Sequence, residues 1–130
     1  MAFDSPDLPY ASFKAAADLS AAQYKFVKLD GNGDVVVCSA ATDRPVGVLQ
    51  NAPTSGQMAT VQYAGITKVQ ADAALNEGDL VGTSADGQAD AKTPGGDTTE
   101  YVVGQMLTAP GAAGRIGTAL INCANPHRAA

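Results

Sequence analysis

The sequence predicts an all-β fold, a small β-sandwich or barrel with at most short helical turns. Short β-branched or aromatic runs of roughly four to eight residues recur along the chain, each bounded by Gly, Asp, Asn or Pro. Only segments 13–23 and 71–77 could form helical turns, and both are too short to be stable alone. Since 5% of the 130 residues are aromatic and none is Trp, small side chains must fill the core of this single domain.

Four β-hairpins account for most of the chain. In the first, segments 24–29 and 35–39 flank the sequence from Asp30 to Asp34, where Gly31 and Gly33 permit the positive φ of a tight turn. Segment 66–70 follows Gly65 as a further strand. The other hairpins are predicted for 46–50 with 59–63, 80–83 with 88–91, and 101–107 with 115–122.

The second pair of hairpins resembles the first at a nearly constant spacing. The similarity reflects either two related β-halves or turns that use the same residues independently, because turn chemistry favours few residue types. Two related halves would give a pseudo-symmetric arrangement of two sheets around one core. The matches are Leu19, Asp30, Gly31 and Asp34 with Leu75, Asp86, Gly87 and Asp90; Val46, Gly47, Ala52 and Pro53 with Val103, Gly104, Ala109 and Pro110; and Gly56 and Thr60 with Gly114 and Thr118.

Charge and cysteine content disfavour several classes of function. The net charge is -5, and the 8 Lys and Arg residues are scattered, whereas a nucleic-acid site needs them clustered. No apolar run reaches the roughly 18 residues of a membrane span, and Asp4 and Asp7 lie where a signal peptide would be basic. We expect Cys38 and Cys123 to be buried, reduced thiols in a soluble protein that is not exported.

No motif predicts catalysis, a metal site or a cofactor. Asp30, Asn32 and Asp34 occupy alternate positions, as the ligands of a calcium loop do. However, Val35 and Ala41 replace the glycine and the acidic ligand that such a loop requires. The only histidine, His127, lies near the C-terminus, where a catalytic base would be poorly held. We therefore expect a binding or structural protein rather than an enzyme.

The N-terminal segment has its own composition. Prolines at 6 and 9 favour extended chain. The same segment nevertheless contains Phe3, Tyr10 and Phe13, three of the seven aromatic side chains of the protein. Such an arm either lies across its own domain and caps the core, or docks on another chain through aromatic anchors. The predicted divisions are an extended arm at 1–16, a β-rich domain at 17–123 and a C-terminal tail at 124–130.

Three sequence blocks resemble the capsid decoration (cement) proteins of tailed bacteriophages, which are similar to the lambda head decoration protein. The resemblance covers roughly residues 17 to 121, and its most specific part is Gly47-Val48-Leu49-Gln50-Asn51-Ala52-Pro53. The other blocks are Ala17-Asp18-Leu19-Ser20-Ala21-Ala22-Gln23-Tyr24 with Val27-Lys28-Leu29, and Gly65 with Val69 followed by Gly78-Asp79-Leu80-Val81.

The resemblance implies a β-tulip-like domain that binds the outer capsid surface as a homotrimer, after synthesis in the host cytoplasm. Its partner would be the major capsid protein, and it would stabilise the expanded head by bridging capsid subunits, with no catalytic residues, cofactor, nucleic acid or membrane. No family motif precedes Ala17, so composition alone assigns the capsid contact to Phe3, Leu8, Tyr10 and Phe13. The alternative is another phage assembly component, such as a head fibre base or a tail β-sandwich protein.

Overall fold

Every regular element in residues 9–130, the part of the chain that the computed structural model describes, is a β-strand. The predicted all-β class is therefore confirmed, and the four predicted hairpins are present as antiparallel pairs. The strands are β1 (Tyr10–Lys14), β2 (Phe26–Leu29), β3 (Val35–Val37), β4 (Gly47–Leu49), β5 (Met58–Gln62), β6 (Ala64–Gln70), β7 (Leu80–Thr83), β8 (Ala89–Ala91), β9 (Tyr101–Val102), β10 (Gly104–Met106), β11 (Ile116–Asn122) and β12 (His127–Arg128).

Segments 13–23 and 71–77, which the sequence indicated could form helical turns, contain no helix. The backbone N–H of Leu19 donates to the carbonyl of Pro53 at 2.9 Å, and that of Leu75 donates to the carbonyl of Pro110 at 3.0 Å. These long-range bonds take up donors that a helical turn would use locally, so tertiary contacts override the high helix propensity of the neighbouring alanines.

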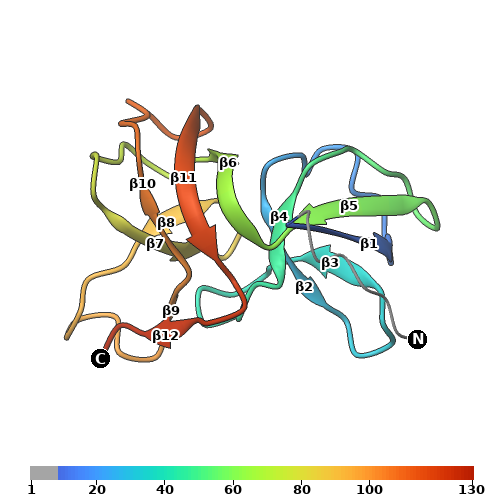
Figure 1. Cartoon of the computed structure of the whole chain (residues 1–130), viewed down its shortest axis with the longest axis horizontal. Helices are drawn as coiled ribbons and strands as arrows, with labels where there is room; N and C mark the ends of the chain where they lie inside the picture. The colour runs from blue at the N-terminus through green and yellow to red at the C-terminus, as the bar shows by residue number, and fades with distance from the viewer. Residues whose placement is uncertain (1–8) are drawn as a thin grey trace.

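The strands form two five-stranded sheets with the same strand order. The first sheet runs β1-β5-β4-β2-β3 and the second runs β6-β11-β10-β7-β8. If β1 is matched to β6, β2 to β7, β3 to β8, β4 to β10 and β5 to β11, the two orders are identical. Figure 1 shows the two sheets side by side, with the small β12-β9 sheet along one edge of the second.

Each sheet curls around its own core until its two edge strands approach each other, so the expectation of one core shared by the two sheets is wrong. In each half the edge strands share a single isolated parallel bridge, Ala15 with Val35 in the first and Ala71 with Ala89 in the second. Since one bridge is not a continuous strand pair, neither sheet is a closed barrel. The first core contains Ala15, Leu19, Ala22, Val27, Val35, Leu49, Ala59 and Val61. The second contains Val69, Ala71, Leu75, Val81, Ala89, Val103, Met106, Ala119, Ile121 and Cys123, joined by Phe26, Cys38 and Val48.

Hydrogen bonds repeat between the halves and show which residues are equivalent. The Leu19–Pro53 and Leu75–Pro110 bonds are one such pair, in agreement with the sequence matches. In the first hairpin the sequence match was two residues out of register: Asp30 Oδ1 accepts from the N–H of Asp34, as Ser84 Oγ accepts from the N–H of Gln88. Asp30 is thus equivalent to Ser84, because glycine and aspartate recur at several positions of these turns and the sequence alone did not fix their register.

The first half packs against the second through the outer face of its sheet. Phe26 and Val48 point away from the first core and are fully buried in the second. Backbone bonds cross this junction from Phe26 N–H to the Gly87 carbonyl, 2.7 Å, and from Gln70 N–H to the Tyr24 carbonyl, 2.9 Å. The junction therefore makes one body of the two halves.

Parts of both predicted terminal segments pair with this body. Residues 10–14, within the predicted arm, form β1 and pair with β5 in the first sheet. In the predicted tail, His127 and Arg128 pair with Val102 and Tyr101, and Ala129 is buried. His127 is thus held in a strand pair rather than lying in a frayed end. The divisions at 1–16, 17–123 and 124–130 themselves stay predictions.

Candidate interaction surfaces

The four residues predicted to contact a capsid have different positions. Phe3 and Leu8 lie outside the described residues. Tyr10 is exposed on β1, whereas Phe13 on the same strand is partly buried and packs against the first core. Because side chains alternate between the two faces of a strand, these residues, three positions apart, point to opposite faces of β1 and differ in burial. The structure does not bring Tyr10 and Phe13 together as one exposed surface.

The outer face of the second sheet carries a row of exposed apolar side chains. Ile66 lies directly opposite Leu120, Leu120 opposite Gln105, and Gln105 opposite Leu80, so the row crosses four strands. Ile66, Leu120 and Leu80 are exposed. Leucine and isoleucine on the solvent side of adjacent strands are typical of an interaction surface.

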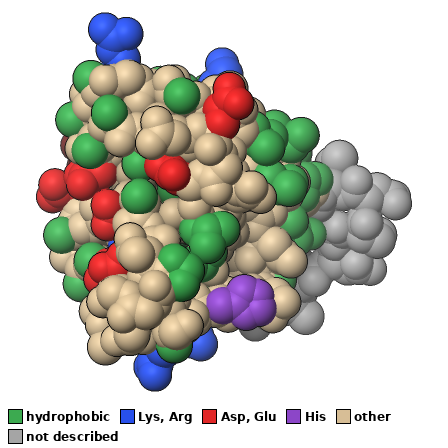
Figure 2. Space-filling view, turned by 90° about the vertical axis from the view of Figure 1, so that its left-hand side faces the viewer, with side chains coloured by type: hydrophobic (Ala, Val, Ile, Leu, Met, Phe, Trp, Pro, Cys, Tyr) green, Lys and Arg blue, Asp and Glu red, His purple; other side chains and the backbone are tan. Residues whose placement is uncertain are grey.

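A shallow groove of about 560 Å³ includes part of this row in its lining. Leu80, Val102, Leu120, Asn122, Asn125 and His127 are among the residues that line it. Figure 2 shows the face that includes the side chain of His127, with hydrophobic side chains beside the histidine. The groove adds concave apolar area to the exposed row, although sequence reasoning singled out neither feature.

A signal for this face was present in β11. In Ile116–Asn122, Gly117, Ala119 and Ile121 are buried while Ile116 and Leu120 point outward. A strand with one solvated face normally alternates apolar with polar residues, so apolar residues at both phases indicate contacts on both faces.

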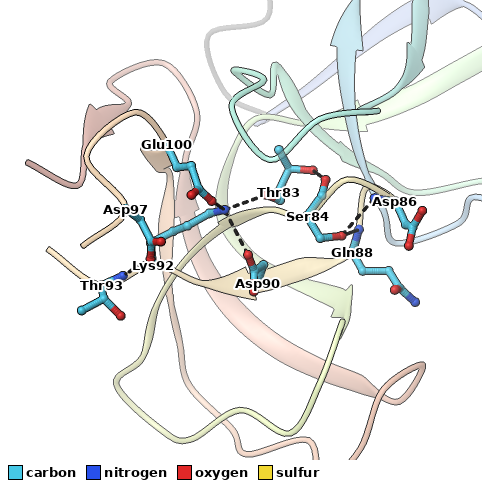
Figure 3. Close-up of polar contacts among 9 residues, drawn as sticks. All are labelled: Thr83, Ser84, Asp86, Gln88, Asp90, Lys92, Thr93, Asp97 and Glu100. Carbon is cyan, nitrogen blue, oxygen red and sulfur yellow. Dashed lines mark hydrogen bonds and ion pairs between the residues drawn. The ribbon is translucent and has the colours of Figure 1, made fainter. Parts of the chain in front are cut away.

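Lys92 forms a buried ionic cluster at the far end of the β7-β8 hairpin. Its side chain is completely buried, and its Nζ donates to the Thr83 carbonyl at 2.8 Å, Asp90 Oδ2 at 3.1 Å and Glu100 Oε1 at 2.5 Å. These contacts use all three ammonium protons. As Figure 3 shows, Asp97 turns back nearby to bind the N–H of Thr93. The cluster ties the 93–100 loop to the second sheet, which indicates a structural role.

The turn carboxylates also serve the fold. Asp30 accepts hydrogen bonds from the backbone N–H groups of Asn32 and Asp34, which closes the first hairpin. Asp43 accepts from Lys28 and from the N–H groups of Ser39 and Ala40, and these bonds lower the pKa of its carboxyl despite partial desolvation. Within residues 9–130, no three or more His, Cys, Asp or Glu side chains are grouped to hold a metal ion.

Both cysteines are free and buried in the second core. Desolvation raises the pKa of each thiol to about 12, and a side-chain hydrogen bond with Thr83 opposes the increase at Cys38. Cys38 also contributes to the raised pKa of Cys123, and both thiols lie in the second core. Neutral thiols of this kind are poor nucleophiles.

Residues 9–130 contain no helix that is long and apolar enough to cross a membrane.

Comparison with known proteins identifies a structural neighbour but no sequence family. No family model and no curated protein matches the chain. Among solved structures, the chain is similar to the head fiber gp8.5 N base in bacteriophage phi29, with a TM-score of 0.65 and 18% sequence identity. The match covers 88% of this chain and 93% of that chain. The two proteins therefore share a fold over nearly their whole lengths.

Proposed function

We propose that this chain is a non-enzymatic structural virion protein that binds the outside of a tailed-phage head. The observation that carries the proposal is the shared fold with the N base of a phage head fiber, over 88% of the chain. The resemblance of the sequence blocks around Gly47–Pro53 to phage decoration proteins independently supports the same proposal.

In the proposed mechanism, a homotrimer spans neighbouring subunits of the major capsid protein and stabilises the expanded head. A ligand present at 100 times its dissociation constant stabilises the state it binds by about 2.7 kcal/mol, and three linked contacts gain further through avidity. The protein would be made in the host cytoplasm and assembled onto the finished shell.

The N-terminal segment would supply apolar anchors to the capsid. The Pro9 carbonyl accepts a hydrogen bond from the Tyr63 N–H at 2.9 Å, which fixes this point of the chain against the body of the protein. Phe3 and Leu8 precede that point, and Tyr10 lies exposed just after it. Apolar anchors of this type contribute strongly when they enter pockets on a partner.

The test is binding of purified protein to expanded heads and to procapsids, measured by co-sedimentation. We expect binding to expanded heads only. Deletion of residues 1–8 should weaken binding on the order of 10-fold or more, because it removes anchors but leaves β1 paired with β5. A matched variant, Phe3→Ser with Leu8→Ser, keeps the length of the segment. Equal binding by the wild type and both variants would refute the role of the segment, and no binding to heads would refute the function.

A second candidate, the base of a head fibre, is favoured by the same structural neighbour, which is itself a fibre base. Electron micrographs of virions carrying a labelled chain distinguish the two. A decoration protein would cover the shell wherever capsid subunits meet, whereas a fibre base would lie beneath each projecting fibre. Label found on tails would contradict both.

A further inference from the structure

Equivalent surfaces of the two halves differ in burial. In the first sheet, Phe26 lies opposite Val48, and Val48 opposite Gln62. The matching row of the second sheet is Leu80, Gln105 and Leu120. The backbone supports this match, because the Phe26 carbonyl accepts from Cys38 N–H as the Leu80 carbonyl accepts from Lys92 N–H.

The first row is covered and the second is not. Phe26 and Val48 are 0% exposed and Gln62 is 3% exposed, since they pack on the second half or against the start of β6. The equivalents Leu80 and Leu120 are 38% and 46% exposed, and Gln105 is also exposed. The second half thus presents, uncovered and largely apolar, the face with which the first half makes the internal junction.

The surface of the second half on which Phe26 packs, and the equivalent surface of the first half, also differ in burial, but here the surface in the first half is the exposed one. In the second half, the end of the sheet that meets Phe26 includes Gly87, whose carbonyl bonds Phe26 N–H, and Thr83, which is 1% exposed. The equivalents in the first half are Gly33 and Leu29. Leu29 is 50% exposed, and a Cβ on Gly33 would meet no atom within 4 Å. The first half therefore has an uncovered receiving end.

We infer that the chain associates head to tail with a second copy, by a contact that repeats the internal junction. The outer face of the second half, formed by Leu80, Gln105 and Leu120, covers the end of the first half of the next copy at Leu29 and Gly33. A second copy is the occupant because, within residues 9–130, each chain exposes a face and a receiving end of the types that already fit each other inside the chain.

Such a contact is heterologous, so it generates either a closed ring or an open chain of copies. A ring of three copies would use every face and every end, and in this choice of ring size the inference rests on the proposed function. The contacting surfaces themselves follow from the internal junction.

The experiment measures self-association of the full chain, without capsid, by sedimentation velocity over a range of concentrations. We expect wild type to assemble, and Leu120→Glu and Leu29→Glu each to raise the dissociation constant on the order of 100-fold, because a carboxylate would be buried without a partner. Ile116→Glu is the matched control: it is also exposed on the outer face of β11, but its equivalent, Met58, is 57% exposed and outside the internal junction. This variant should assemble like wild type.

Mixing the two defective variants tests the polarity of the contact. A Leu120→Glu copy keeps its receiving end and a Leu29→Glu copy keeps its face, so the mixture should form a one-to-one dimer although neither variant assembles alone. An isologous contact would not be restored in this way. The inference is overturned if wild type remains monomeric, if Leu120→Glu assembles normally, or if the mixture stays monomeric. Head binding is scored separately, so a monomer that binds heads overturns this interface and leaves the virion function standing.

Discussion

The Gly87→Ala substitution should destabilise the protein more than Gly33→Ala, although the two glycines occupy equivalent turn positions. Both have positive φ, +78° at Gly87 and +86° at Gly33, so each alanine bears a similar backbone strain of about 1 kcal/mol. A Cβ on Gly87 would lie 2.5 Å from Val37 Cγ1 and 3.1 Å from the Phe26 carbonyl oxygen. Val is stiff and the other atom is backbone, so the junction between the halves must shift.

Overpacking of this kind lowers the free energy of unfolding by a further amount of about 1 to 3 kcal/mol. The total loss is therefore about 2 to 4 kcal/mol for Gly87→Ala, against about 1 kcal/mol for Gly33→Ala. Urea titration monitored by circular dichroism measures both, and the melting temperatures should differ by roughly 4 to 12 °C. Both substitutions are made in the Leu120→Glu background, so that self-association does not contribute. Equal losses in the two variants would refute the account of the junction.

Three further predictions concern buried polar groups. Lys92→Met should lower the free energy of unfolding by about 2 to 4 kcal/mol, because it leaves two carboxylates without their buried partner. The control Lys28→Met breaks a partly exposed pair with Asp43 and should lower it by less than about 1 kcal/mol. Equal losses of the two variants on urea titration would contradict the structural role of the cluster. The thiols of Cys38 and Cys123 should resist alkylation at neutral pH until the protein unfolds, because burial raises their pKa from 9.0 to about 12. Since the unfolded chain loses these protons at lower pH than the folded protein, the free energy of unfolding should fall as pH rises from 9 toward 12. The fall should be smaller in a variant with both cysteines replaced by alanine. An identical dependence of the free energy of unfolding on pH in the two proteins would show that the thiols are not responsible.

The hairpins were predictable because their determinants are local. Gly31 and Gly33 occupy positive-φ positions between β2 and β3, and Asp30 closes the turn with its own side chain. These interactions involve residues within four positions of each other, so they can be read from the order of amino acids. The repeat was visible for a different reason: the residues that form one repeated long-range bond, Leu19 with Pro53 and Leu75 with Pro110, also matched in the sequence.

The junction between the halves was not predictable in the same way. Phe26 and Val27 are adjacent, both apolar and both fully buried, but Phe26 enters the second core while Val27 enters the first. Burial of both faces of a strand shows only that each face has a partner. Lys92 gave no signal either, since a single lysine in a polar stretch is normally a solvated residue.

The order of amino acids by itself determined that this protein is all-β and where its turns fall, because steric restrictions on φ and the alternation of strands act over a few residues. It left open whether the two halves are related, because similar turns can arise independently. Only the tertiary structure decided which sheet face became the internal junction and which equivalent face, at Leu80 and Leu120, was left exposed. That choice depends on how two preformed sheets dock, and the free energy of docking comes from the apolar area brought together by residues far apart in the chain.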